Sequence, residues 1–220
     1  MTHLSPVVQR LRITFGKAGP LRYTSNLDMA KIWERTLRRA ELPLLYTRGF
    51  NTRPRISLAM PLPLGISSDC EILDISLRER LDFCEAGLRE RLLAVSPHGL
   101  SIVAIEEVAP RSSAVQSRIV SAEYHIRFYD RQERASLQRK IAELLAQSTI
   151  IVERTRRRKR SVMDVRPLIL SLNIDEQANL LAHLSVGDRG NLRPDDLLEL
   201  LNLDGAHSSI HRSRLHMLSE

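Results

Sequence analysis

The sequence has little cysteine, no long apolar run and no glycine-rich loop of the kind that binds nucleotide phosphates. Its two cysteines, Cys70 and Cys84, are too few for a disulfide framework and cannot hold an iron–sulfur cluster by thiolates alone. No stretch approaches the roughly 18 apolar residues of a transmembrane helix, and residues 1–10 lack the apolar run of a signal peptide. We therefore expect a cytoplasmic protein with no membrane partner and no cofactor.

What the chain has in surplus is positive charge. Its 33 lysine and arginine residues exceed its 26 aspartate and glutamate residues, which gives a formal net charge of +7 at pH 7. Such a surplus raises the expectation of a polyanionic partner, although the solvated surfaces of many proteins are also basic. With 43% hydrophobic residues, the 220-residue chain can also bury a sizeable core.

Two consecutive halves with one order of elements account for this length. In the first half, apolar periodicity and breaker residues predict strands over 8–15, 44–47, 71–77 and 100–108 and helices over 25–40 and 82–95. A long loop over 48–68 is expected to hold a further short strand over 56–60. In the second half the same patterns predict strands over 122–129, 149–155, 168–172, 180–186 and 210–215 and helices over 134–147 and 193–203. The predicted fold class is α+β, with tandem ferredoxin-like (β-α-β-β-α-β) halves and elaborated Arg-Pro loops.

The stretch between the halves is polar and lacks periodicity, which is typical of a linker. We therefore predict a first domain over 1–110, a linker over 111–121 and a second domain over 122–220. Within the first domain, Ser25 and Asp28 form a capping pattern that starts a helix. Met29, Trp33 and Leu37 then fall on one face of that helix, which predicts that this face is buried.

The loop from Arg48 to Arg55 is the most informative candidate site. Arg48, Arg53 and Arg55 supply forked donors that match pairs of phosphate oxygens. Phe50 is of a kind that stacks on a nucleic-acid base, and Asn51 can read a base edge or hold the loop through its own backbone. The alternative is that Phe50 fills the core and the prolines only shape a turn.

Other cations extend this candidate nucleic-acid interface. The second half contains five consecutive cations, which are Arg156, Arg157, Arg158, Lys159 and Arg160. They are interpreted either as phosphate contacts or as the solvated tip of a hairpin. Lys17 and Arg22 precede the first predicted helix, whose N-terminus attracts anions. Arg166 and Arg193 complete the set, with an ion pair between Asp164 and Arg166 as the alternative for Arg166. The candidate residues are Lys17, Arg22, Arg48, Phe50, Asn51, Arg53, Arg55, Arg156, Arg157, Arg158, Lys159, Arg160, Arg166 and Arg193.

Several loops resemble those of a known family. The segments 16–28, 49–57 and 61–65, followed by 164–167 and 191–195, are similar to the radical-SAM-linked protein family, a domain found alone or fused to cobalamin-binding radical SAM proteins. The resemblance spans most of the chain and implies partnership with a radical SAM enzyme. The resemblance provides no enzymatic activity that could be expected of this chain. One departure is Asn26, where relatives tend to carry histidine, so no imidazole is available at that position.

These observations favour a non-catalytic RNA-binding accessory partner of a radical SAM enzyme, acting on structured RNA in modification or processing. We predict no catalytic residues and no metal site, because His207, His211 and His216 lack an accompanying cysteine or paired carboxylate at metal-binding spacing. Two alternatives stay open. One is a metal-independent endoribonuclease, which would need a general base near the 2′-hydroxyl. The other is a protein adapter with no RNA role.

Overall fold

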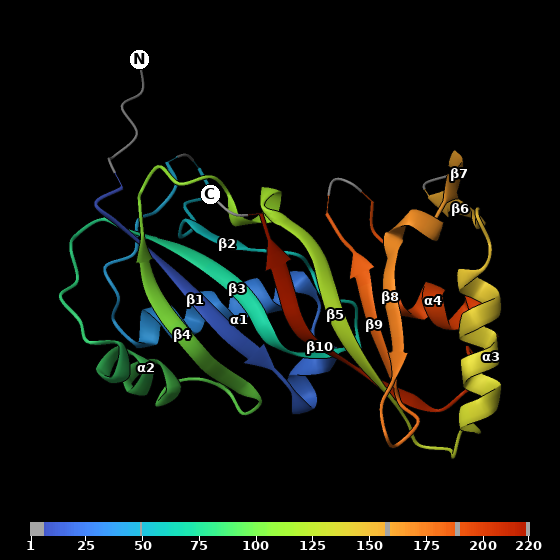
Figure 1. Cartoon of the computed structure of the whole chain (residues 1–220). Helices are drawn as coiled ribbons and strands as arrows, with labels where there is room; N and C mark the ends of the chain where they lie inside the picture. Colours follow the sequence, from blue (N-terminus) through green and yellow to red (C-terminus); the bar gives the residue numbers. More distant parts are fainter. Residues whose placement is uncertain (1–6, 49, 157–158, 188–189, 219–220) are drawn as a thin grey trace. The chain divides into compact units, whose positions relative to one another are not determined.

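The structure, a computed structural model, describes residues 7–48, 50–156, 159–187 and 190–218, without the side chains of residues 154–161. It has an α+β fold (Figure 1) and divides into two compact units, residues 1–118 and 119–220. None of the described helices combines the length and the hydropathy that crossing a membrane requires.

The first unit is a sheet covered by two helices. Its elements, in order, are β1 (Gln9–Lys17), α1 (Asn26–Arg39), β2 (Ile56–Leu58), β3 (Ser67–Leu77), α2 (Glu85–Leu93) and β4 (Leu100–Val108). The spatial order is β4-β1-β3, with β2 on β3, and every pair is antiparallel. Two 3-10 turns, η1 (Gly19–Tyr23) and η2 (Val115–Ser117), flank these elements, and η2 lies within the predicted linker.

The core of this unit forms on one face of the sheet. Leu11, Ile13 and Phe15 alternate along β1 and pack in one cluster with residues of both helices. The Trp33 ring of α1 is completely buried and meets Phe15 edge to face, with ring centroids 4.9 Å apart. The side chain of Ser25 caps α1 by accepting from the N–H of Asp28 (3.2 Å), as predicted. The Ser25 hydroxyl also donates to the Asp28 carboxylate and so holds the pKa of Asp28 below its usual value.

The opposite face of the same sheet buries charge. Asp74 on β3 accepts hydrogen bonds from Arg10 (2.5 Å) and Arg12 (2.8 Å) on the neighbouring β1. Asp74 and Arg12 are both buried. The two guanidiniums offset the cost of taking the carboxylate out of water, since an unpaired buried charge is strongly unfavourable.

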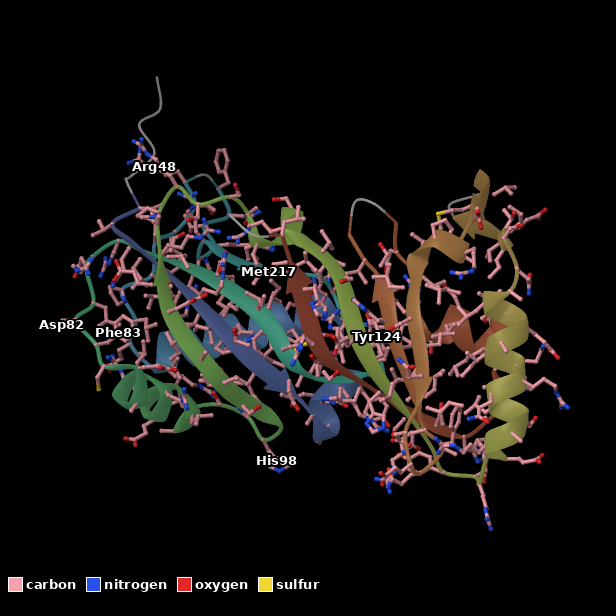
Figure 2. All side chains as sticks on the ribbon, in the orientation of Figure 1. Arg48, Asp82, Phe83, His98, Tyr124 and Met217 are labelled. Atoms are coloured by element: carbon pink, nitrogen blue, oxygen red, sulfur yellow. The ribbon has the colours of Figure 1, made fainter. Side chains whose placement is uncertain are left out.

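The second unit contains β5 (Ile119–Phe128), α3 (Arg134–Leu145), β6 (Ile151–Arg156), β7 (Lys159–Asp164), η3 (Arg166–Leu168), β8 (Ile169–Ile174), β9 (Leu180–Ser185), α4 (Pro194–Leu200) and β10 (Ser208–Met217). Four strands form an antiparallel sheet in the order β10-β5-β9-β8, and β6 pairs with β7. Tyr124 and Ile126 of β5 and Leu137 and Ile141 of α3 are among the buried residues; Figure 2 labels Tyr124.

Two predicted elements were wrong. The strand over 44–47 is reduced to isolated bridges, of Leu44 with Leu77 and of Tyr46 with Pro54. The short strand expected in the long loop forms β2 and pairs with β3. Residues 159–164 were predicted as loop but form β7. Among the residues of the cationic run, Arg156 on β6 lies opposite Lys159 on β7, and Arg160 lies opposite Thr155.

Candidate nucleic-acid interface

The loop of residues 48–52 has a fixed base. The N–H of Thr47 donates to the carbonyl oxygen of Arg53 (2.8 Å), and the N–H of Arg53 donates to Oγ1 of Thr47 (3.0 Å). A bridge between Tyr46 and Pro54 lies directly behind this pair. The N–H of Arg55 then donates to the carbonyl oxygen of Leu45 (2.7 Å). These bonds join the residues on either side of the loop to one another.

Phe50 stands in solvent at this loop. Its relative exposure is 110%, the largest among the exposed hydrophobic residues. The alternative that Phe50 fills the core is therefore wrong for this structure. Arg48, Asn51 and Arg53 are also exposed, and Figure 2 shows Arg48 at the edge of the first unit, near the start of β1. The loop thus presents an aromatic ring among guanidiniums.

A second aromatic residue at the base of the loop was missed by sequence reasoning. Tyr46 is 38% exposed, and its hydroxyl accepts a hydrogen bond from Nε of Arg38 (3.1 Å). The Arg38 guanidinium lies 5.6 Å from the Tyr46 ring centroid, within cation–π range. The bond to Tyr46 is the main cause that raises the pKa of Arg38. Tyr46 was overlooked because it was assigned to a strand, where its side chain would be a packing residue.

A groove of about 530 Å³ lies beside the loop, and its lining includes Arg10, Thr47, Arg55, Asp74 and Arg111. Since Asp74 is held by its two arginine partners, the other cations give the groove a positive balance. Arg55 is half-buried there, and Arg111 is exposed. The groove therefore continues the cationic surface of the loop, and Arg111 is a lining residue that the sequence did not single out.

The two cations expected near the first helix are engaged within the fold. Lys17 is only 3% exposed, and its Nζ donates to the carbonyl oxygen of Thr24 (2.8 Å). It lines a small pocket with Asn26 and Glu71. The Arg22 guanidinium lies over its neighbour Tyr23, 4.7 Å from the ring centroid. Lys17 is therefore buried, whereas Arg22 is half-buried and contacts its neighbour in the chain.

In the second unit the candidate cations have different fates. The Arg166 guanidinium donates to the carbonyl oxygens of Leu145 (3.1 Å) and Ile169 (3.3 Å), so it fastens the turn after β7. Asp164 contributes by accepting the Arg166 backbone N–H (3.0 Å), not through an ion pair with the guanidinium. Arg193 is exposed at the start of α4. Arg157 and Arg158 lie outside the described residues, as do the side chains of Arg156, Lys159 and Arg160.

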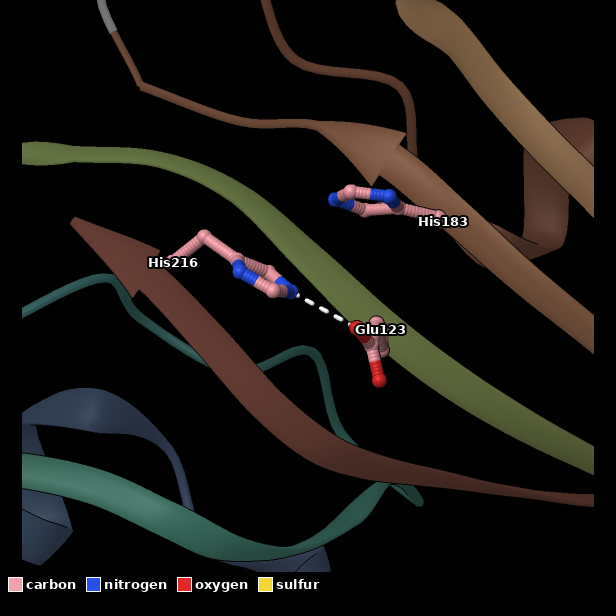
Figure 3. Close-up of side chains that lie close together, drawn as sticks. All are labelled: Glu123, His183 and His216. Carbon is pink, nitrogen blue, oxygen red and sulfur yellow. Dashed lines mark hydrogen bonds and ion pairs between the residues drawn. The ribbon is translucent and has the colours of Figure 1, made fainter. Parts of the chain in front are cut away.

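Sequence reasoning also missed a cluster of titratable side chains, shown in Figure 3. Nε2 of His216 lies 2.7 Å from Oε1 of Glu123, and Nε2 of His183 lies 2.8 Å from Oγ of Ser121. The two imidazole rings have centroids 4.7 Å apart. Burial, and next the neighbouring His216, lower the pKa of His183. Alternation along a single strand gives no signal for this cluster, because it depends on which residues of three strands lie opposite one another.

Comparison with known proteins places the chain in a family. Residues 10–194 match a family described as uncharacterized protein conserved in bacteria (DUF2344). The chain belongs to this family. No curated protein sequence matches this DUF2344 member. The family match covers β1 through the start of α4, and therefore includes both the loop of residues 48–52 and the β6–β7 hairpin.

Two solved structures show a distant similarity to this DUF2344 protein. A crystal structure of a Cbf5-Nop10-Gar1 complex matches with a TM-score of 0.47 and 13% identity, over 93% of this chain and 48% of that chain. The archaeal box H/ACA sRNP Nop10-Cbf5 complex matches with a TM-score of 0.42 and 11% identity, over 96% and 49%. The chain thus spans about half the length of each matched chain. These distant likenesses carry no conclusion about function.

Proposed function

We propose that this chain is a non-catalytic, cytoplasmic RNA-binding protein that serves a radical SAM enzyme in RNA modification or processing. One observation carries the RNA-binding part: the hydrogen-bonded loop of residues 48–52 holds the Phe50 ring in solvent among exposed arginines. Stacking of a base on such a ring contributes about 1–3 kcal/mol. Guanidiniums beside it bind phosphate oxygens in pairs. The loop therefore offers both kinds of contact that an unpaired RNA segment requires.

Each exposed candidate has a role in this proposal. Phe50 stacks on a base, and Asn51 reads a base edge. Phosphate contacts come from Arg48, Arg53, Arg55 and Arg111 in the first unit, and from Arg156, Arg157, Arg158, Lys159, Arg160 and Arg193 in the second. Lys17, Arg22 and Arg166 are left out, because the structure engages them in contacts within their own units.

We also propose that each unit is a ferredoxin-like half. The strand orders support this: β4-β1-β3-β2 in the first unit and β10-β5-β9-β8 in the second. In each unit the second of the four sheet strands along the chain, β2 or β8, lies at the edge of the sheet. This strand pairs antiparallel with the third strand, β3 or β9. The β6–β7 hairpin is then an insertion before that edge strand, and it carries the cationic run outside the four-stranded sheet.

Large apolar side chains near the start of α1 support a protein partner. Tyr23, Leu27 and Leu64 are 62%, 73% and 63% exposed. The N–H of Gly65 donates to the carbonyl oxygen of Arg22 (2.8 Å), which places the loop carrying Leu64 beside η1. Exposed apolar groups that lie together are typical of protein interaction sites. This patch is our candidate contact for the radical SAM enzyme.

The test is RNA binding by the purified chain, measured by fluorescence anisotropy with single-stranded, hairpin and duplex RNA in the presence of a metal chelator. We expect saturable binding to the single-stranded and hairpin RNAs, weaker binding to the duplex, and intact RNA on a denaturing gel. RNA cleavage in the presence of chelator would replace the proposal with the endoribonuclease alternative. Absence of RNA binding, together with capture of the radical SAM enzyme, would replace it with the protein adapter.

A further inference from the structure

The cluster of Glu123, His183 and His216 lies on three neighbouring strands of the second unit. Glu123 on β5 is directly opposite His183 on β9, and His216 on β10 is opposite Ser121, two residues from Glu123 along β5. Residues opposite one another, and residues two apart on a strand, share a face of the sheet. The register itself therefore brings the three side chains to one face, as Figure 3 shows.

The distances suit a metal ion. One ligand atom from each of Glu123, His183 and His216 lies within 4.8 Å of the others. In a tetrahedral zinc site with bonds of about 2.0–2.1 Å, ligand atoms lie roughly 3.3 Å apart. Small side-chain rotations therefore close the present cluster around an ion, and no change in the strands is needed. An ion in this position would replace the contact between Nε2 of His216 and Oε1 of Glu123.

We infer that Glu123, His183 and His216 bind a divalent transition-metal ion, with Zn²⁺ as the best match. Imidazole nitrogen and carboxylate oxygen are ordinary zinc ligands, and a set of two histidines and one glutamate leaves a coordination position for water or another ligand. The Ser121 hydroxyl supports the site, because it is buried and holds the His183 ring (2.8 Å). Partners of this kind orient metal-binding histidines.

Other histidines on this sheet supply a matched control. His125 pairs with Asp175 (3.1 Å), and His211 on β10 lies opposite His125, on the same strand as His216. Neither belongs to the three-residue cluster. A His211→Ala variant therefore removes an imidazole from the same strand and leaves the proposed ligands in place.

The experiment is a Zn²⁺ titration of the full, chelator-treated chain in competition with a chromogenic chelator. We expect one equivalent bound, with affinity lowered at least about tenfold in His183→Ala, His216→Ala and Glu123→Gln and unchanged in His211→Ala; losing one ligand contact of about 1.4 kcal/mol corresponds to tenfold. Circular dichroism checks that each variant is folded. No stoichiometric binding, or an equal loss in His211→Ala, would overturn the assignment.

A second measurement needs no variant. Zn²⁺ added to the unaltered chain should shift the imidazole NMR signals of two histidines and leave the other imidazole signals unchanged. Shifts spread over all histidines, or no shift, would contradict the site. The inference does not depend on the proposed function, since both readouts are made without RNA, and failure of RNA binding would leave them unaffected.

Discussion

The N–H of Thr47 donates to the carbonyl oxygen of Arg53 (2.8 Å), and the return bond from the N–H of Arg53 ends on the Thr47 side chain (3.0 Å). This pair closes the loop that carries Phe50 before any ligand arrives. A ligand that binds a closed loop does not have to order it, so less affinity is lost to conformational entropy. In the proposed function, this arrangement reduces the entropy that stacking of a base on Phe50 would cost.

Arginines of the loop and groove should control the salt dependence of RNA binding. Each phosphate contact removed lowers the slope of log affinity against log salt concentration by about 0.7 for single-stranded RNA. We expect this change in Arg53→Ala and again in Arg55→Ala, measured by anisotropy over a salt series. Arg139→Ala is the control, because Arg139 is exposed on α3 in a loose pair with Glu143 (4.0 Å). An equal slope change in Arg139→Ala would indicate a nonspecific effect of charge.

The cationic hairpin gives a separate prediction. Changing Arg156, Arg157 and Arg158 together to Ala should weaken RNA binding and lower the salt slope, with a stability change within about 0.5 kcal/mol, as for most surface substitutions. Anisotropy and thermal unfolding measure the two effects. RNA affinity and salt slope that both match the unaltered chain would remove this hairpin from the interface and favour the protein adapter.

Much of the first helix could be predicted from sequence. The Ser25–Asp28 cap and the buried face with Met29, Trp33 and Leu37 follow from local spacing, and the structure confirms both. Local rules also indicated β1, β3 and β4 of the first unit and β5, β8, β9 and β10 of the second, since alternation of apolar residues is a property of one segment. The Arg48–Arg55 loop was found for the same reason: its composition alone marks it as unusual.

Long-range pairing could not be predicted in this way. The Glu123–His183–His216 cluster depends on the register between three strands, and no local pattern fixes which residues face one another. The burial of Lys17 likewise depends on the folded chain, because its Nζ donates to the backbone carbonyl oxygen of Thr24, seven residues away. The exposure of Phe50 could not be predicted either, because the composition of the loop is compatible with a buried phenylalanine and with a solvent-exposed one.

Asp74 should be essential for stability. Asp74→Asn leaves Arg10 and Arg12 without their buried carboxylate, and breaking a buried pair in this way costs about 3–5 kcal/mol. Urea unfolding measures the loss. The control is Glu79→Gln, which breaks the exposed Arg78–Glu79 pair (3.2 Å) and should cost less than about 1 kcal/mol. Equal losses of unfolding free energy in both variants would show that the buried Asp74 pairs stabilise the fold no more than an exposed ion pair does.

Asp175 should make stability fall in acid. Burial, the largest single influence, raises the pKa of Asp175, but hydrogen bonds from Asn179, His125 and Gln177 together outweigh it and hold this pKa below the ordinary 3.8. The unfolded chain therefore binds the proton more readily. The stabilisation is complete well above pH 3.8 and is lost as pH falls below this value and through the lower pKa of Asp175 in the folded chain.

The matched variant for this effect is Asp175→Asn, which cannot titrate. Its free energy of unfolding, measured by urea unfolding over a pH series, should be lower than that of the unaltered chain near neutral pH. The difference between the two should shrink as the solution becomes more acidic than the ordinary pKa of aspartate. A difference that stays constant over the whole series would show that the Asp175 carboxylate does not contribute through its charge.

The most direct test of RNA binding through the loop is a comparison of Phe50→Ala with the unaltered chain in RNA affinity, salt slope and melting temperature. Because the ring is exposed, the melting temperature should change little, whereas a buried phenylalanine would cost about 3–5 kcal/mol on truncation. RNA affinity should fall by about 1–3 kcal/mol, with the salt slope unchanged, since stacking involves no phosphate. Unchanged RNA affinity, or a large fall in melting temperature, would contradict base stacking by Phe50.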